Sequence, residues 1–316
     1  MRSKTDIYYE IFDEIAMMLI EELGIDYLDA FHRTKDLIID DQHEENISEI
    51  ASKKIKYLLK ALYKETFSQE DIRLALQLLT VKAFKSMNKT IELMTPDSIN
   101  YILSRIINHK FANQTLRILD INLGTSNLLQ TIANNFPNEK DLLGIEKDQN
   151  LVNLASSWAE LENNDLKIYW QDVMMPIYDM ADIEVGDLDD GLYQKPLPPT
   201  HPLFQSNISY YPYLAISSKL ENLKDQGYFF YLINNDFFAA DEVLTFRNYF
   251  QKHATMLALI VLPESMFQSK QKQKSILIGK KACLKSWELM IFPITSFSKT
   301  QIPNILTKLD QFTDNL

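Results

Sequence analysis

A short glycine turn contains the first residues that could do chemistry, Asp120-Ile-Asn-Leu-Gly124-Thr-Ser-Asn127. Glycine in such a turn lets the backbone come close to a ligand. Thr125 and Ser126 would begin the following helix, whose first N–H groups have no partner within the helix and can bind a ligand. One glycine turn is a weak signal, because a purely structural turn between a strand and a helix can have the same sequence.

Two acidic residues further along the chain strengthen this signal. Glu146 ends the next apolar segment, about 20 residues after the turn, and a carboxylate there can accept hydrogen bonds from ribose hydroxyls. Asp172 ends the third apolar segment, where it or the neighbouring backbone can bind an adenine amino group. Asp148 could instead cap the next helix. The set fits an adenosine-containing cofactor, and S-adenosylmethionine is favoured over NAD because the second glycine of a G-x-G-x-x-G sequence is absent.

These residues need a sheet to bring them together, and the sequence after residue 115 predicts one. Apolar, β-branched segments alternate with amphipathic ones, which indicates an α/β domain with a mostly parallel sheet. The expected strands are 117–122, 141–147, 166–172, 181–188, 227–235 and 256–263, with 274–281 and 287–294 as a closing antiparallel pair. The expected helices between them are 126–135, 149–162, 213–223 and 240–252. Ligands bind outside the carboxyl ends of such strands, where the glycine turn and both acids fall.

The first third of the chain has a different composition. Gly24 is alone in the first 120 residues, and no proline precedes Pro96. Apolar residues recur at three- and four-residue spacing, so residues 1–95 are expected to form four helices. A further helix would begin at Thr95-Pro96 and end near residue 109. The predicted domains are a helical N-terminal domain, residues 1–110, and an α/β domain, residues 111–316.

Several segments together, in one order, resemble a known family. They are MTPDSI (94–99), ILDINLGTSNLL (118–129), LLGIEKDQ (142–149), GYFFYLINNDFF (227–238) and LPESMFQSKQKQKSILIGKK (262–281). The set is similar to the small stand-alone bacterial proteins described as adenine-specific DNA methylases, which are class I S-adenosylmethionine-dependent methyltransferases. The resemblance implies a Rossmann-like α/β sheet, mostly parallel and of seven strands, preceded by an all-helical N-terminal domain. It also implies S-adenosyl-L-methionine as the cofactor.

The resemblance assigns roles to particular residues. The Thr-Pro segment and the glycine turn would bracket the methionine end of the cofactor, Glu146 would hold the ribose, and Asp172 would lie near the adenine. The residues implied to bind the cofactor are Thr95, Pro96, Asp120, Gly124, Asn127, Glu146 and Asp172.

In amino-methylating enzymes the catalytic motif follows the fourth strand as Asp/Asn-Pro-Pro-aromatic, and in this small family an Asp-Leu-Pro pattern is expected. The Asp or Asn side chain and the proline carbonyl hold the hydrogens of a weakly nucleophilic amine, and the aromatic residue stacks on a base taken out of the duplex. This chain has Asp187-Leu-Asp189-Asp190-Gly-Leu-Tyr193, so Asp187 and Tyr193 are the candidate catalytic residues. Asp189 replaces the key proline.

Glycine is also missing at two places where the family has it. The usual Gly-Thr-Gly of the first turn is Gly124-Thr-Ser126, which would narrow the space for the cofactor. Gln226 stands where relatives tend to have paired glycines before the fifth strand.

The charged residues near the motif lead to opposite expectations about nucleic-acid binding. The net charge is −11, and acids cluster within twelve positions at Asp179, Asp182, Glu184, Asp187, Asp189 and Asp190. Such an acidic mouth would repel phosphate groups. A lysine run that could face nucleic acid, or simply be a solvated loop, includes Lys270, Lys272, Lys274, Lys280 and Lys281.

Composition excludes several other classes. One cysteine rules out an intramolecular disulfide framework and a cysteine-cluster zinc site, and five scattered histidines predict no metal site. No apolar run reaches the about 18 residues that span a bilayer, and the N-terminus has acids where a signal peptide is apolar, so a cytoplasmic location is expected.

Three functions stay open. The first is an S-adenosylmethionine-dependent N-methyltransferase of the adenine-specific DNA methylase type with a degenerate catalytic motif. The second is a catalytically inactive relative that binds a cofactor or a partner. The third is a small-molecule methyltransferase, because an acidic loop would suit a cationic or neutral acceptor better than DNA. The fold alone does not separate them.

Overall fold

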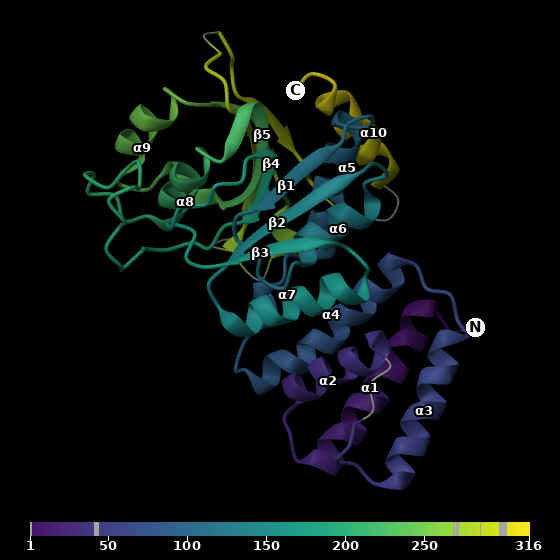
Figure 1. The fold of residues 1–316 in the computed structure, drawn as a ribbon. Helices are drawn as coiled ribbons and strands as arrows, with labels where there is room; N and C mark the ends of the chain where they lie inside the picture. Colours follow the sequence, from purple (N-terminus) through teal and green to yellow (C-terminus); the bar gives the residue numbers. More distant parts are fainter. Residues whose placement is uncertain (1, 41–43, 268, 270–271, 285, 297–301) are drawn as a thin grey trace.

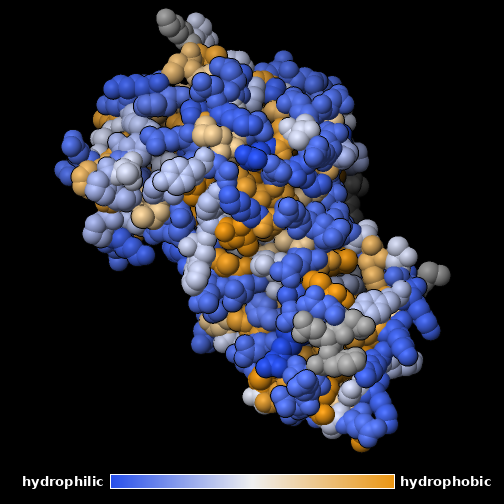
Figure 2. Space-filling view, viewed as in Figure 1, coloured by the Kyte–Doolittle hydropathy of each residue, from blue (hydrophilic) through white to orange (hydrophobic). Residues whose placement is uncertain are grey.

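The computed structural model of the protein describes residues 2–40, 44–267, 269, 272–284, 286–296 and 302–316. Figure 1 shows an α/β part built on one sheet, with a bundle of helices below it in that view. The space-filling view of the same face shows two lobes covered mostly by hydrophilic residues, with hydrophobic ones gathered near the middle of the upper lobe (Figure 2). Within the described ranges, no helix combines the length and apolarity that crossing a membrane requires.

Four helices form the N-terminal bundle, which we call the helical bundle: α1 (Lys4–Leu23), α2 (Tyr27–Ile39), α3 (Glu49–Tyr63) and α4 (Gln69–Ser86). Each begins directly after a Ser or Asp whose side chain accepts a hydrogen bond from the first turn: Ser3, Asp26, Ser48 and Ser68. Helix α1 ends at Gly24, which takes the left-handed conformation that favours glycine (φ 67°). The four predicted helices are confirmed.

One sheet holds eight strands in the order β3-β2-β1-β4-β5-β7-β6-β8. The strands are β1 (Leu116–Asp120), β2 (Lys140–Glu146), β3 (Leu166–Trp170), β4 (Ala181–Asp187), β5 (Leu223–Asn234), β6 (Thr255–Val261), β7 (Lys274–Lys280) and β8 (Met290–Pro293). Strands β1 to β5 pair in parallel, whereas β7 is antiparallel to both β5 and β6. The mostly parallel α/β sheet is confirmed, with eight strands in place of the seven expected.

The expected closing pair of strands, 274–281 with 287–294, is wrong. Strand β7 lies between β5 and β6, and β8 pairs with β6 in parallel, Ala258 opposite Met290. The physical reason is burial. The inner residues of β7 are buried on both faces, so this strand needs a neighbour on each side. The residues of β8 alternate between half-buried and exposed, which is typical of an edge strand.

Helices cover both faces of the sheet (Figure 1). They are α5 (Asp97–Lys110), α6 (Asn127–Asn135), α7 (Gln149–Leu161), α8 (Tyr211–Lys219), α9 (Val243–Phe250) and α10 (Ile302–Thr313). Neighbouring residues of one strand face opposite cores, because side chains alternate along a strand: Ile118 packs with α5, α6 and α10, and Leu119 packs with α8 and α9. Helix α10 was not predicted. Helix α8 ends before residue 223, where β5 already begins.

The core of the helical bundle and the cores of the sheet do not divide at the predicted domain boundary after residue 110. The apolar residues of α5, from Ile99 to Ile107, belong to the core of the sheet. Met94 is the last residue of the bundle core before α5. Residues of α7 such as Trp158 also belong to the bundle core. The cores therefore divide near Thr95-Pro96, where the chain enters α5.

Candidate functional site

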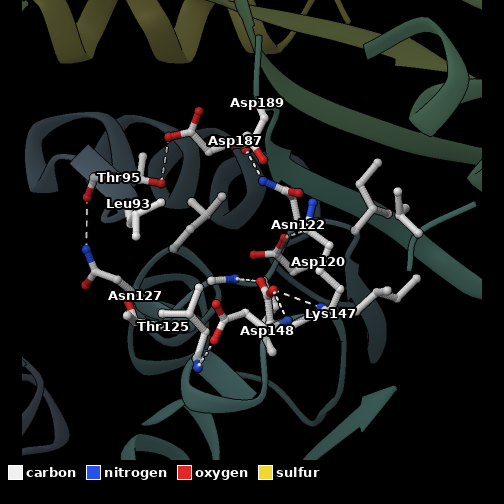
Figure 3. A pocket seen from close by; sticks show the side chains of 18 of the residues that line it. Leu93, Thr95, Asp120, Asn122, Thr125, Asn127, Lys147, Asp148, Asp187 and Asp189 are labelled. Atoms are coloured by element: carbon white, nitrogen blue, oxygen red, sulfur yellow. Dashed lines mark hydrogen bonds between the residues drawn. The ribbon is translucent and has the colours of Figure 1, made fainter. Parts of the chain in front are cut away.

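A pocket lies at the carboxyl ends of β1, β2 and β4, where the turns that follow these parallel strands meet (Figure 3). The residues singled out from the sequence that line it are Thr95, Asp120, Gly124, Asn127, Glu146, Asp172 and Asp187. Pro96 and Tyr193 are not among its lining residues. A parallel sheet explains the convergence, because it brings the strand ends to one edge.

The glycine turn forms one wall of the pocket. Gly124 has φ 56°, and a Cβ atom there would lie 3.4 Å from the backbone oxygen of Leu93. Ser126 also has a positive φ, 67°, directly before helix α6. This is the position at which the resemblance led us to expect a second glycine. The Thr125 and Ser126 hydroxyls are buried and have no hydrogen-bond partner among the residues that the structure describes. Thr125 is also one of the residues that line the pocket.

Hydrogen bonds to Glu146 connect the turn after β2 to the glycine turn after β1. Its carboxylate accepts hydrogen bonds from the backbone N–H groups of Gly124 (3.0 Å), Lys147 (2.8 Å) and Asp148 (2.8 Å). Burial raises the pKa of Glu146, against the lowering effect of these three bonds. A carboxylate has about four acceptor positions, so one remains for a ribose hydroxyl. Asp148 caps α7, which is the alternative role expected for it, and pairs with Lys89 at 2.6 Å.

Asp120 and Asn122 form the floor of the pocket. Asp120 is almost fully buried, and burial raises its pKa to about 7 although the N–H of Asn122 donates to it at 3.0 Å. The side chain of Asn122 donates to the backbone oxygen of Asp187 (2.7 Å) and accepts from the hydroxyl of Tyr211 (2.8 Å). Asn122 was not singled out from the sequence, although it lies between two residues that were.

Asp187 lies at the end of β4 with donors on both carboxylate oxygens. The Thr95 hydroxyl donates to Oδ2 at 3.0 Å, and Lys274 Nζ donates to Oδ1. Asp189, in the place of the expected proline, also lines the pocket. Burial raises the pKa of Asp189, while the charges of Lys147 and Lys274 act in the opposite direction. This end of the pocket therefore has the carboxylates of Asp187 and Asp189, with the ammonium groups of Lys147 and Lys274 lining the same pocket.

Tyr193 lies beside Asp172. Its hydroxyl donates to Asp172 Oδ2 at 3.2 Å, and burial raises its pKa to about 12. Asp172 Oδ1 accepts from the backbone of Met174 at 3.1 Å. The tyrosine thus contacts the residue predicted for the adenine.

The expected acidic mouth of six residues is wrong, because β4 separates the residues before it from those at its carboxyl end. Asp179 lies just before β4 and pairs with Lys167, and Asp182, near the start of the strand, pairs with Lys224. Glu184 is fully buried in the middle of the strand. The acids at the pocket end are Asp187, Asp189 and Asp190, and of these Asp190 accepts from the hydroxyl of Tyr210 at 2.8 Å.

The lysine run is also divided by its strand. Lys274 begins β7 at the pocket, and Lys280 ends it. Six residue steps of a strand span about 20 Å. At the far end Lys280 lies 5.2 Å from the centre of the Tyr228 ring, and Lys281 donates to the backbone of Leu223 at 2.6 Å. Lys272 precedes β7, and Lys270 lies outside the described residues.

The helical bundle and most of the chain have recognisable relatives. A family model described as the YtxK N-terminal helical domain matches residues 6–84. The uncharacterized protein YtxK of Bacillus subtilis (strain 168) is 30% identical over 268 residues, which cover 82% of this chain and 80% of YtxK.

Two solved structures are similar in fold. The crystal structure of a putative class I S-adenosylmethionine-dependent methyltransferase (lmo1582) from Listeria monocytogenes has a TM-score of 0.82 and 26% identity, covering 98% of this chain and 99% of that one. The methyltransferase subunit of a type I restriction-modification system from Streptococcus thermophilus has a TM-score of 0.61 and 12% identity, covering 97% and 73%. The second likeness concerns the fold alone. The chain has the class I methyltransferase fold, in which S-adenosylmethionine is the methyl donor.

Proposed function

This chain belongs to the YtxK family, and from that premise we propose that it is an S-adenosylmethionine-dependent N-methyltransferase of the adenine-specific DNA methylase type. One observation carries the proposal: residues from several separate turns, chosen from the sequence for binding this cofactor, line a single pocket at the carboxyl edge of the sheet. The class I fold supports the cofactor. The acceptor, an exocyclic amine of a nucleobase, rests on the family resemblance and on Asp187.

The pocket fits the cofactor by the chemistry of its donors and acceptors. The Thr125 hydroxyl is buried and unpartnered, Glu146 keeps one acceptor position, and Gly124 leaves open the space that a side chain would occupy. Thr125, Gly124 and Asn127 would hold the methionine end, Glu146 the ribose, and Asp172 the adenine.

The chemical step then needs little from the protein beyond placing the amine. When bound, S-adenosylmethionine would supply the methyl group: the methyl–sulfur bond would break as the amine lone pair forms the N–C bond, and S-adenosylhomocysteine would leave with the sulfur electron pair. Asp187 accepts a hydrogen bond from the amine and so orients the lone pair. Asp189 takes the proton that the methylated nitrogen loses. Its pKa is raised by burial, which makes this carboxylate a better proton acceptor than an exposed aspartate.

A second function is favoured by a specific observation, which is that both oxygens of Asp187 already have donors, Thr95 and Lys274. An acceptor amine has to share or displace one of them. The occupied Asp187 oxygens and Asp189 in the place of the expected proline both support this second function, in which the protein binds the cofactor without transferring its methyl group.

Calorimetric titration with S-adenosylmethionine and S-adenosylhomocysteine tests the cofactor, and transfer of labelled methyl groups to unmethylated DNA of mixed sequence tests the acceptor. Binding with transfer to DNA supports the proposal. Binding without transfer to DNA supports the second function, provided that small amines added to the same assay are also unmethylated. No binding of either compound at millimolar concentration overturns both.

A matched pair of glycine variants localises the binding. Gly124→Ala and Gly191→Ala both place a Cβ at a positive φ, 56° and 128°, so both carry backbone strain. Gly124 lines the pocket and Gly191 does not. Only the first should weaken binding of S-adenosylhomocysteine. Equal affinities in the two variants would place the cofactor elsewhere.

A further inference from the structure

Arg73 of helix α4 has an acceptor for every N–H group of its guanidinium although it is fully buried. Glu70 accepts from Nε at 2.9 Å and from Nη2 at 2.6 Å. Nη1 donates to Asp97 Oδ1 at 2.9 Å and to Asn127 Oδ1 at 2.5 Å, and Nη2 donates to the Tyr101 hydroxyl at 3.3 Å. A lysine could not replace this set, because its three donors share one nitrogen.

The contact with Asn127 connects Arg73 to the pocket, because Asn127 is the first residue of α6 and lines the pocket. Its Oδ1 accepts from Arg73 and, at 3.0 Å, from Gln77 of the same bundle helix. Arg73 can only donate, so the amide oxygen of Asn127 must face α4. The amide nitrogen is then directed to the backbone oxygen of Thr95, to which it donates at 2.9 Å.

Thr95 connects Asn127 to the end of β4. Its hydroxyl donates to Asp187 Oδ2 at 3.0 Å, and Figure 3 shows Asn127, Thr95 and Asp187 connected in this order. Asn100 supports the same Thr95 oxygen with a longer bond of 3.2 Å. Arg73 is not a lining residue of the pocket, yet three successive contacts connect it to Asp187.

We propose that Arg73 is a positioning residue for the methyl-donor pocket, so that the helical bundle sets the affinity of the pocket through Asn127 and Thr95. This inference rests on the proposed function, because it concerns the binding of the same cofactor. The bundle is then part of the cofactor site. Without Arg73 the Asn127 oxygen keeps only Gln77, whose own amide can turn together with that of Asn127. If the Asn127 amide reverses, the Thr95 carbonyl loses the shorter of its two side-chain donors.

The test compares two variants of one helix. Arg73→Lys keeps the charge and loses the five-donor set. Lys82→Gln, also on α4, removes the two hydrogen bonds of 2.6 and 2.7 Å to Asp13 within the bundle, and these bonds do not involve Asn127. Calorimetry should show S-adenosylhomocysteine binding about tenfold weaker for Arg73→Lys and within about twofold of the wild type for Lys82→Gln. Hydrogen exchange of the backbone amides of residues 123–128 should rise in the first variant alone, a change that a general loss of stability would not localise.

A double-mutant cycle tests whether Arg73 acts through Asn127. In an Asn127→Ala background, Arg73→Lys should change the affinity by no more than about twofold. If Arg73→Lys does not fold, Arg73→Met combined with Glu70→Gln takes its place, because this pair leaves no unpaired charge at Glu70.

The outcomes separate this inference from the proposed function. A wild-type chain that binds no S-adenosylhomocysteine overturns the proposed function and the inference with it. A wild type that binds, with an Arg73 variant of equal affinity, overturns the inference alone. A full additional loss in the Asn127→Ala background overturns the path through Asn127.

Discussion

The hydroxyl of Thr95 donates a hydrogen bond of 3.0 Å to Asp187 Oδ2 and joins the exit of the helical bundle to the end of β4, 92 positions further along the chain. Lys274 holds the other carboxylate oxygen from β7. Asp187 is therefore fixed in direction, and an acceptor amine would have to share or displace one of these two donors.

Asp187→Ala should lower methyl transfer by about 100-fold or more, because the acceptor amine loses its positioning group, while S-adenosylhomocysteine still binds. The measurement is transfer of labelled methyl groups beside a calorimetric titration. Asp190→Ala is the matched control, since Asp190 belongs to the same loop and contacts Tyr210 instead of the pocket. Transfer that survives in Asp187→Ala would show that Asp187 does not position the amine.

Ser126→Gly should stabilise the protein by about 1 kcal/mol, because a non-glycine residue in the left-handed conformation costs roughly 1–2 kcal/mol and glycine gives back part of this in unfolded-state entropy. Ser126 has φ 67°, and the same value occurs at Gln226, an exposed residue of β5 where its pairing with β4 is irregular. Gln226→Gly is therefore expected to raise the thermal unfolding midpoint in a similar way. Only Ser126→Gly should also change the affinity for S-adenosylhomocysteine. A lower midpoint in both variants would contradict the strain argument.

Glu184→Gln should become more stable relative to the wild type as pH rises from 5 to 9. Glu184 is fully buried, and burial raises its pKa to about 8, although Tyr231 donates a hydrogen bond to it. Between its ordinary pKa of 4.5 and about 8, the unfolded chain loses this proton while the folded chain keeps it. The free energy of unfolding of the wild type therefore falls through this window and levels off above it, whereas glutamine does not titrate.

Thermal unfolding at several pH values measures this difference between Glu184→Gln and the wild type. Parallel curves for the wild type and Glu184→Gln would mean that Glu184 is charged in the folded protein.

The local sequence was sufficient to predict the parts of the site that lie directly after a strand. Asp120, Gly124 and Glu146 could be placed at one edge because parallel strands in series bring their following turns together. Lys274 could not be placed, because its position depends on the antiparallel pairing of β7 with β5, and a buried apolar strand does not specify its neighbours. The same limit explains the error about β8.

Arg73 shows a different limit of the sequence. Its segment, Gln69-Glu-Asp-Ile-Arg73, looks like a charged helix surface, and charged residues are mostly exposed. Its burial arises because the helical bundle packs on α6 and α7, and those contacts are between residues far apart in the sequence. The prediction of an acidic cluster around β4 was wrong for the opposite reason, because closeness in the sequence was interpreted as closeness in space.

Gly279→Ala should destabilise the protein by about 1–3 kcal/mol through overpacking. Gly279 of β7 lies opposite Phe229 of β5, and a Cβ at Gly279 would overlap the Phe229 ring. This ring is fully buried and packs on Tyr231 and Phe250, so it has no room to move.

Chemical denaturation measures the cost of Gly279→Ala, and two further variants decide its cause. In Gly144→Ala the new Cβ meets the side-chain end of Leu123, at 2.6 Å, which can shift more easily than a ring, so the loss should be smaller. Adding Phe229→Leu to Gly279→Ala should cost less than the sum of the two single losses, because it removes the overlapping ring. Strict additivity of the two losses would show that the overlap with Phe229 is not the cause.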